Sequence, residues 1–291
     1  MRYCLLLSVL IGAATLGGCT EGVLDPKGPI ATAERQILFN SLGIMLAIVI
    51  PTILATLGFA WWFRWSNTRA RYLPDFEYSG RLEMLVWSIP IMTVLLVGGV
   101  AWVGSHDLDP PKPIASAVKP IRVQVISLDW KWLFIYPEQG IAAVNQLTIP
   151  VGTPVSFELT SSSVMNSFHV PQLGGQIYTM AGMTTRLHLQ ADHPGTYRGA
   201  SANYSGEGFA DMRFNVDAVP AEQFAQWVDV ARSGGPVLDA PAYADLAKPS
   251  KAVAPFTYRS AAPGLFTSIL SSTMRSDGPS RLTSVASQRT E

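Results

Sequence analysis

The sequence predicts a two-helix transmembrane hairpin followed by an all-β sandwich and a short helical tail. Two long runs without a charged residue, 37–63 and 84–105, predict the hairpin, because each is long enough to cross a bilayer. Short alternating segments separated by Gly and Pro turns predict the sandwich over residues 120–218. The composition agrees, since 48% of the 291 residues are hydrophobic and only 14% are charged.

Charge balance and cysteine positions exclude several classes of function. The 21 basic residues equal the 21 acidic ones, so the formal net charge of zero argues against a nucleic-acid partner. The two cysteines are Cys4 and Cys19, both near the start of the chain. Disulfides, cysteine-bound zinc, iron–sulfur clusters and thiolate-bound copper are therefore excluded from the rest of the chain.

The N-terminus has the pattern of a lipoprotein signal. A weakly basic start leads into an apolar run with the length of a signal peptide, which predicts a cleaved signal over residues 1–18. The run ends in Leu-Gly-Gly-Cys, which resembles a bacterial lipobox, so we expect lipidation of Cys19, with palmitate among the acyl chains. An ordinary signal peptide with a chance cysteine is the alternative. If Cys19 is lipidated, residues 19–36 form a lipid-anchored periplasmic segment.

The distribution of positive charge predicts the orientation of the two spans. The loop 64–83 holds four arginines, whereas two basic residues precede the first span and two closely follow the second. Positive residues stay on the cytoplasmic side, so the loop is predicted to be cytoplasmic and both ends of the chain periplasmic. We expect a multi-pass protein of the bacterial inner membrane with a periplasmic C-terminal domain.

The sandwich begins after a proline-rich linker, residues 106–119. Seven segments between residues 121 and 217 predict strands: IRVQVIS, WKWLFIY, NQLTIP, VSFELTS, TTRLHLQ, GTYRGAS and DMRFNVD.

The chain beyond the sandwich is predicted to be helical over residues 219–275. Apolar residues spaced as on one helix face run from Phe224 to Ala231, and two shorter helical candidates follow at 243–247 and 265–274. We expect too little apolar content after residue 235 for a separate core. Residues 276–291 are predicted to be disordered.

Four motifs of the predicted sandwich are long and specific. They are DWKW at 129–132, YPEQGIAAVN, SVMNSFHVPQLGGQIYTMAGM and SANYSGEGFADM. Together with the lipobox and two spans, they resemble subunit II of the haem–copper terminal oxidases, in the quinol-oxidase branch of the cytochrome bo or ba type. The resemblance covers nearly the whole chain and implies a cupredoxin-like fold for residues 120–218.

The same resemblance implies that a copper site has been lost. In the cytochrome c branch this domain carries a binuclear copper centre held by two cysteines, two histidines, a methionine and a glutamate carbonyl. The corresponding positions here are assigned to His169, Ser201, Asn203, Ser205, Phe209 and Met212. Hydroxyls cannot replace the bridging thiolates, so we expect no metal in this chain.

The histidines leave some alternatives open. His169 is either a relic, a hydrogen-bonded core residue or a sign of divergence from the quinol branch. For His188 and His193, structural or surface roles are favoured over zinc ligation, which needs further ligands.

By resemblance, the chain is a non-redox subunit II of a proton-pumping ubiquinol oxidase, with no catalytic centre of its own. Haem b, haem o or a, and one copper are expected in subunit I. The implied partners are subunits I, III and IV, membrane lipid, and ubiquinol as substrate of the complex, with no cytochrome c. A lipid-anchored scaffold or assembly protein is the alternative, and a cytochrome c oxidase subunit II is the weaker one.

Two further groups of residues receive roles. Glu83, at the start of the second span, is by resemblance the entry of the proton channel, whereas a plain helix-dipole or interface role is the alternative. Trp130, Trp132 and Tyr136 are expected to pack against the helical subunits, because an electron route through tryptophan has no copper to reach.

Overall fold

The structure is a computed structural model that describes residues 22–71 and 73–276. The predicted signal peptide, the lipidation of Cys19 and the tail from residue 277 lie outside the described residues. The chain divides into two compact units, one of residues 33–112 and one that joins residues 22–32 to residues 113–276. Each unit is described by itself.

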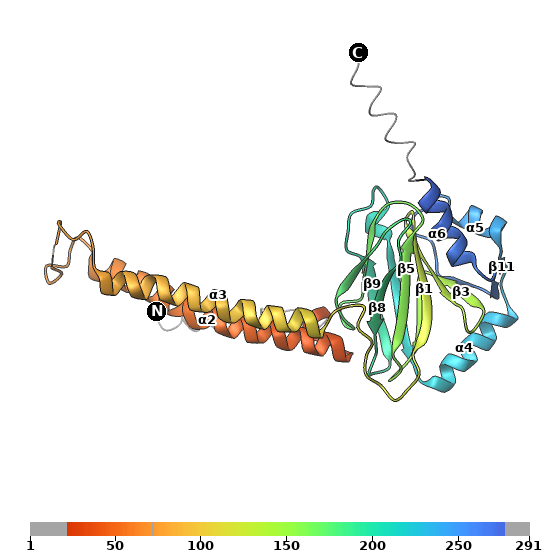
Figure 1. Cartoon of the computed structure of the whole chain (residues 1–291), viewed down its shortest axis with the longest axis horizontal. Coiled ribbons are helices and arrows are strands. Elements are labelled where there is room, and N and C mark those ends of the chain that lie inside the picture. Colours follow the sequence, from red (N-terminus) through yellow and green to blue (C-terminus); the bar gives the residue numbers. More distant parts are fainter. Residues whose placement is uncertain (1–21, 72, 277–291) are drawn as a thin grey trace, which may run out of the picture. The chain divides into compact units, whose positions relative to one another are not determined.

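The helical unit consists of two long helices, α2 (Pro29–Trp62) and α3 (Gly80–Asp107) (Figure 1). Both are long and apolar enough to cross a membrane. They extend beyond the uncharged runs, because Pro29 suits the first helical position and Ser79 ends the preceding loop in an extended conformation. Nearly all their large apolar side chains are exposed in this chain, as expected for helices that need lipid or other subunits around them.

The other unit is a β-sandwich. Its six-stranded sheet has the order β12-β3-β2-β1-β5-β8, and its five-stranded sheet has the order β4-β10-β9-β6-β7. The first ten strands are β1 (Ile121–Leu128), β2 (Lys131–Tyr136), β3 (Ile141–Val144), β4 (Gln146–Pro150), β5 (Val155–Ser161), β6 (Asn166–His169), β7 (Gln176–Thr179), β8 (Thr185–Leu189), β9 (Gly195–Ser201) and β10 (Arg213–Val219). Within the sandwich β1 pairs in parallel with β5, and β10 with β4.

Aromatic rings fill the space between the two sheets. Trp132 and Phe134 point inward from β2 because alternate strand residues share a face. Phe168 and Phe214 both pack against these two rings. The Phe168 ring stacks on Phe214 at 5.1 Å between centroids and meets Trp132 edge-on at 5.5 Å. We call this cluster, with its apolar surroundings, the inner core.

A second core covers the outer face of the six-stranded sheet. The chain after β10 forms α4 (Ala221–Ser233), β11 (Val237–Leu238), α5 (Ala240–Leu246), β12 (Phe256–Tyr258), β13 (Ser260–Ala261) and α6 (Leu265–Ser276). We call residues 234–276 the C-terminal arm; Figure 1 shows α5 and α6 beside the sheet that contains β1 and β3.

This outer core joins arm residues to side chains of the sheet. Its buried members are Ile126, Leu128, Leu133, Ile135, Ala142, Val144, Leu238, Tyr258, Leu265, Phe266 and Ile269. The arm does not form a separate core of its own, in line with the low apolar content expected after residue 235. The sheet supplies much of the apolar surface that the arm covers.

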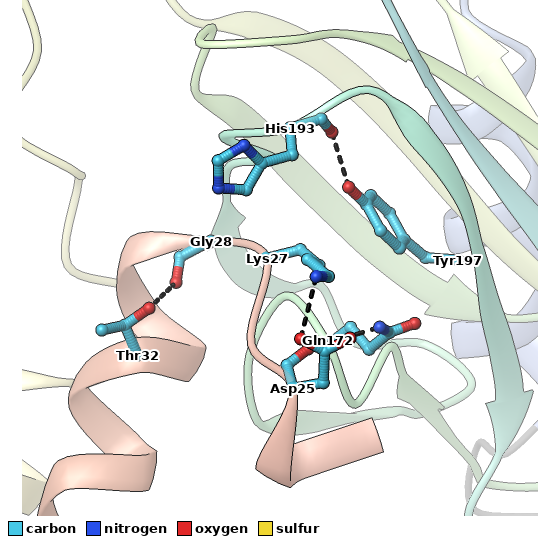
Figure 2. Close-up of polar contacts among 7 residues, drawn as sticks. All are labelled: Asp25, Lys27, Gly28, Thr32, Gln172, His193 and Tyr197. Carbon is cyan, nitrogen blue, oxygen red and sulfur yellow. Dashed lines mark hydrogen bonds and ion pairs between the residues drawn. The ribbon is translucent and has the colours of Figure 1, made fainter. Parts of the chain in front are cut away.

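The segment that leads into α2 lies on the sandwich. The backbone N–H of Lys27 donates to the carbonyl of Gln172 at 2.7 Å, and the N–H of Asp192 donates to the carbonyl of Lys27 at 2.7 Å. Figure 2 shows the chain passing Asp25 and Lys27, turning at Gly28 and entering α2. The predicted hairpin, sandwich and helical tail are confirmed, with three short strands, β3, β6 and β7, added between the predicted ones.

Candidate functional site

The loop after β9 gathers several of the predicted former copper positions. The Ser201 hydroxyl donates to the carbonyl of Asn203 at 3.1 Å and also contacts Asn166 Oδ1 at 3.2 Å. The Ser205 hydroxyl lies 3.8 Å from Met212 Sδ, which is buried. Ser201, Asn203, Ser205 and Met212 therefore lie in one cluster.

His169 lies on the other side of the sheet from this cluster. Phe168 is the cross-strand partner of Ser201, so those two side chains share the inner face, while His169 pairs with Ala200. Asn166, two residues before Phe168, also shares the inner face and contacts Ser201. The structure thus brings Asn166 to the serine where the assignment by resemblance placed His169. Alternation from Phe168 was the signal in the sequence that could have found it.

The His169 imidazole is half-buried, and this burial lowers its pKa below the usual range for histidine. A lowered pKa keeps the ring neutral at pH 7. Phe209 meets the Tyr204 ring edge-on at 5.7 Å. Aromatic packing therefore occupies the position where the resemblance places a second histidine in the copper-bearing branch.

The donor set of this cluster does not fit a binuclear copper centre. It consists of hydroxyls, amide oxygens and one thioether, whereas a mixed-valence copper pair needs soft thiolate bridges. The Ser201 hydroxyl is already used in hydrogen bonds within the chain. Over residues 22–71 and 73–276, no three His, Cys, Asp or Glu side chains come together as a metal site.

Trp130 organises the tip of the loop. Its indole N–H donates to the carbonyl of Ser205 at 2.9 Å. The backbone of Gly208 lies directly against the ring. A Cβ at that position would come within 2.4 Å of it, so the close contact needs glycine. The Lys251 ammonium of the arm lies 5.6 Å from the ring centroid and forms an ion pair of 2.8 Å with Glu207. Both the arm and the loop therefore contribute contacts to Trp130.

Trp132 and Tyr136 do not reach the surface. Both are fully buried in the inner core, so the expectation that they pack against other subunits is corrected; only the half-buried Trp130 retains that possibility. The Tyr136 hydroxyl donates to the carbonyl of Thr148 and accepts from its N–H, both at 2.9 Å. Burial strongly raises the pKa of Tyr136.

Lys131 is a buried residue that the sequence analysis did not single out. Its ammonium donates to the carbonyls of Asp129 at 3.2 Å and Lys248 at 2.8 Å, and to the Ser250 hydroxyl at 2.5 Å. Burial lowers the pKa of Lys131, and the Asp129 charge partly opposes this. Two of the three acceptors belong to the arm, so Lys131 attaches the arm to β2.

In the helical unit, Glu83 lies in the first turn of α3. Its carboxylate accepts a hydrogen bond of 3.0 Å from the indole N–H of Trp87, one turn further along. Trp87 was not singled out by the sequence analysis, although its spacing of four residues from Glu83 places both on one helix face.

His188 and His193 were also considered from the sequence. His188 Nε2 lies 3.1 Å from the Ser156 hydroxyl on the neighbouring strand. The backbone carbonyl of His193 accepts a hydrogen bond of 2.5 Å from the Tyr197 hydroxyl (Figure 2). The contact of His188 therefore involves its ring, whereas that of His193 involves its backbone.

The two sheets form a cupredoxin-like domain, and the family matches place it in the class of terminal-oxidase subunits II. Residues 137–219 match the family described as "Cytochrome C oxidase subunit II, periplasmic domain". Residues 232–276, which include the whole arm, match the "COX Aromatic Rich Motif".

Full-length relatives specify the branch. The chain is 48% identical over 261 residues to "Cytochrome bo(3) ubiquinol oxidase subunit 2" of Pseudomonas aeruginosa, covering 90% of this chain and 79% of that protein. It is 48% identical to "Ubiquinol oxidase subunit 2" of Acetobacter aceti, covering 91% and 86%, and 39% identical to "Quinol oxidase subunit 2" of Bacillus cereus, covering 80% and 81%. The chain therefore belongs to the subunit 2 family of the haem–copper quinol oxidases.

Proposed function

We propose that this chain is the non-redox subunit of a proton-pumping ubiquinol oxidase, which oxidises ubiquinol and reduces oxygen to water. The observation that supports the proposal is the loop after β9, where the Ser201 hydroxyl is already hydrogen-bonded within the chain. By resemblance, Ser201 and Ser205 are assigned to the positions of the two bridging thiolates. A subunit without a copper ligand set offers no redox centre for cytochrome c. Its family membership supports quinol as the electron donor of the complex.

The redox groups are assigned to another polypeptide. Haem b, haem o or a, and one copper belong to subunit I in this proposal, and subunits III and IV complete the complex. The two apolar helices of this chain would pack on subunit I, consistent with the exposure of their large side chains. Trp130 is the aromatic residue proposed to contact a neighbouring subunit, because it remains half-buried at the sandwich end.

The proposed location is the bacterial inner membrane, with the sandwich in the periplasm and the loop 64–83 in the cytoplasm. Four arginines in that loop support this orientation. Lipid attached to Cys19 would hold the N-terminus at the outer leaflet.

Glu83 is proposed as the cytoplasmic entry of the proton path through subunit I. A carboxylate in the first turn of α3 can take protons from the aqueous side and is stabilised by the helix dipole. Replacing Glu83 by Gln should slow ubiquinol oxidation and leave the haem content unchanged. An unchanged rate would contradict this role.

The whole proposal is tested by purification through a tag on this chain. We expect co-purifying haem, with ubiquinol-dependent and not cytochrome c-dependent oxygen uptake. The reduced-minus-oxidised spectrum of the same sample would identify the haem types. A preparation without haem would contradict the proposal and favour a lipid-anchored scaffold or assembly protein.

A further inference from the structure

The short helix η1 (Gly22–Leu24) presents two apolar side chains at the start of the described chain. Val23 is 41% exposed and Leu24 is 53% exposed, although both belong to a segment that is otherwise held on the sandwich. Two neighbouring aliphatic side chains gain free energy when they leave water, so they are suited to a lipid interface.

The position of η1 is fixed by the contacts of the residues that follow it. The N–H of Asp25 donates to the carbonyl of Gly22 at 3.1 Å, which closes the turn of η1. The carbonyl of Asp25 accepts from the side chain of Gln172 at 3.3 Å, and the Lys27 ammonium lies 2.8 Å from the Asp25 carboxylate. The backbone of Lys27 is hydrogen-bonded on both sides to the sandwich.

Two glycines allow this close docking. A Cβ on Gly28 would lie 2.1 Å from the carbonyl oxygen of Gln190, so only glycine lets the chain approach the sandwich there. A Cβ on Gly174 would come within 3.1 Å of Ile30 and 2.7 Å of Leu189. The segment is therefore built to lie against the sandwich, and η1 is held by it.

The chain turns at Gly28 between η1 and α2. Figure 2 shows the chain passing Asp25 and Lys27, turning at Gly28 and entering α2 at the level of Thr32. The Thr32 hydroxyl donates to the carbonyl of Gly28 at 2.8 Å, which fixes the first turn of the helix. Because α2 begins at Pro29, η1 lies close in the sequence to the start of the first predicted span.

We propose that η1 is a membrane-contact element whose Val23 and Leu24 insert among outer-leaflet lipids. This inference rests on the proposed periplasmic topology. Val23 follows Cys19 by four positions, and four extended residues span at most about 14 Å. Acyl chains on Cys19 would therefore keep η1 within reach of the bilayer surface, while the docked segment holds the sandwich at a set height above it.

The test uses the complete oxidase, reconstituted in phosphatidylcholine vesicles. Leu24→Cys is labelled with a small fluorophore, and quenching by lipid carrying a nitroxide near the headgroup is compared with quenching by aqueous iodide. The matched control is Val230→Cys on α4, a position that is 70% exposed. We expect lipid quenching about threefold stronger at Leu24 than at Val230, with iodide quenching in the opposite order.

Each other outcome overturns the inference. Equal iodide quenching at both positions would place Leu24 in water, and protection from both quenchers would place it in a protein interface. If the Leu24 label prevents assembly, Val23→Cys provides the same measurement. Quinol-dependent oxygen uptake and the mass of the N-terminal peptide are recorded on the same sample, so that a failure of the proposed function or of lipidation is seen separately.

Discussion

The six-stranded sheet has an apolar core on each face, and the two cores are held in different ways. The inner core consists of aromatic rings from the strands themselves, with Phe168 at its centre. The outer core is closed by an arm that follows the sandwich in sequence. Hydrogen bonds from Lys131 of β2 and from Asn145, between β3 and β4, attach the arm to the sheet. The sandwich interior therefore depends on packing, whereas the arm also depends on a few specific hydrogen bonds.

Lys131 and Asn145 make the fastening. Asn145 accepts from the N–H of Trp132 at 2.8 Å and donates to the carbonyl of Val253 at 2.8 Å, so one side chain joins the sheet to the arm. Lys131 reaches Lys248 in the same way. Two buried polar side chains therefore attach the arm to the sheet by hydrogen bonds, whereas ring packing joins the two sheets of the sandwich.

The largest effect is expected from Phe168→Ala in the inner core. The substitution removes the ring that touches Trp132, Phe134, Phe157 and Phe214, and a cavity of this kind costs about 3–5 kcal/mol. Urea unfolding of the detergent-solubilised chain, followed by tryptophan fluorescence, measures it. The exposed Val230→Ala is the control, and a loss no greater than that control would disprove the central role of this ring.

Lys131→Met should act mainly on the outer core. It leaves the Lys248 carbonyl and Ser250 without their buried donor, at a cost of about 1–3 kcal/mol. Hydrogen exchange should rise in the arm between residues 248 and 253 and remain unchanged in β2. The control Lys248→Met alters an exposed ammonium and should leave exchange unchanged; equal exchange increases in both cores would contradict separate fastening.

Alkaline pH should affect the inner core more than the outer one. Burial raises the pKa of Tyr136 strongly and that of Tyr258 less, so the stability that each neutral phenol contributes is complete below pH 10 and is lost as pH rises above it. Lys131, whose pKa is lowered, acts oppositely, because stability rises with pH up to its ordinary value of 10.5.

The comparison of Tyr136→Phe with Tyr258→Phe measures this difference. Unfolding free energies between pH 9 and about pH 12 should lose their downward slope more in the first variant than in the second. Identical slopes in the two variants would show that the inner core does not govern alkaline unfolding.

The smallest effect is expected at the exposed ion pair of Lys251 and Glu207. Lys251→Ala removes the pair and the cation over Trp130, and it should loosen the loop tip slightly without unfolding either core. Indole fluorescence of Trp130 and hydrogen exchange at residues 205–208 report the change. Glu207→Gln, which keeps the shape of the side chain, should loosen the loop tip as much as Lys251→Ala does at low salt. The effects of both substitutions should disappear at about 0.5 M salt, because salt screens an exposed ion pair. An effect that persists at high salt would show that the two side chains act through packing.

The strands that enclose the inner core and both long helices could be predicted from local sequence patterns, but neither core could be predicted in detail. Trp132 and Tyr136 were expected to face other subunits, and their burial between the sheets depends on how distant strands pair. The outer core combines Leu133 and Ile135 with Leu265 and Ile269, residues more than a hundred positions apart, which no local pattern connects. The same limit explains the short strand β3, which carries no alternation because both its faces are buried.

The loop after β9 shows a different limit. Resemblance identified the serines, and alternation along the strand places Asn166 on the same face as Phe168. That this face meets Ser201 depends on strand register, which is set by pairing with a distant strand. Histidine is also a common metal ligand, which favoured His169 over a neighbouring asparagine.

Because β2 is covered on both faces, a fragment of this chain stays soluble only if it ends beyond the residues that cover the outer face. The copper-domain family match ends at residue 219, yet a fragment cut there would expose Leu133, Ile135 and their outer-face neighbours as one apolar surface. Such a fragment should aggregate, whereas one that continues through Ile269 would keep that surface covered. The family match and the smallest fragment expected to stay soluble therefore end at different residues.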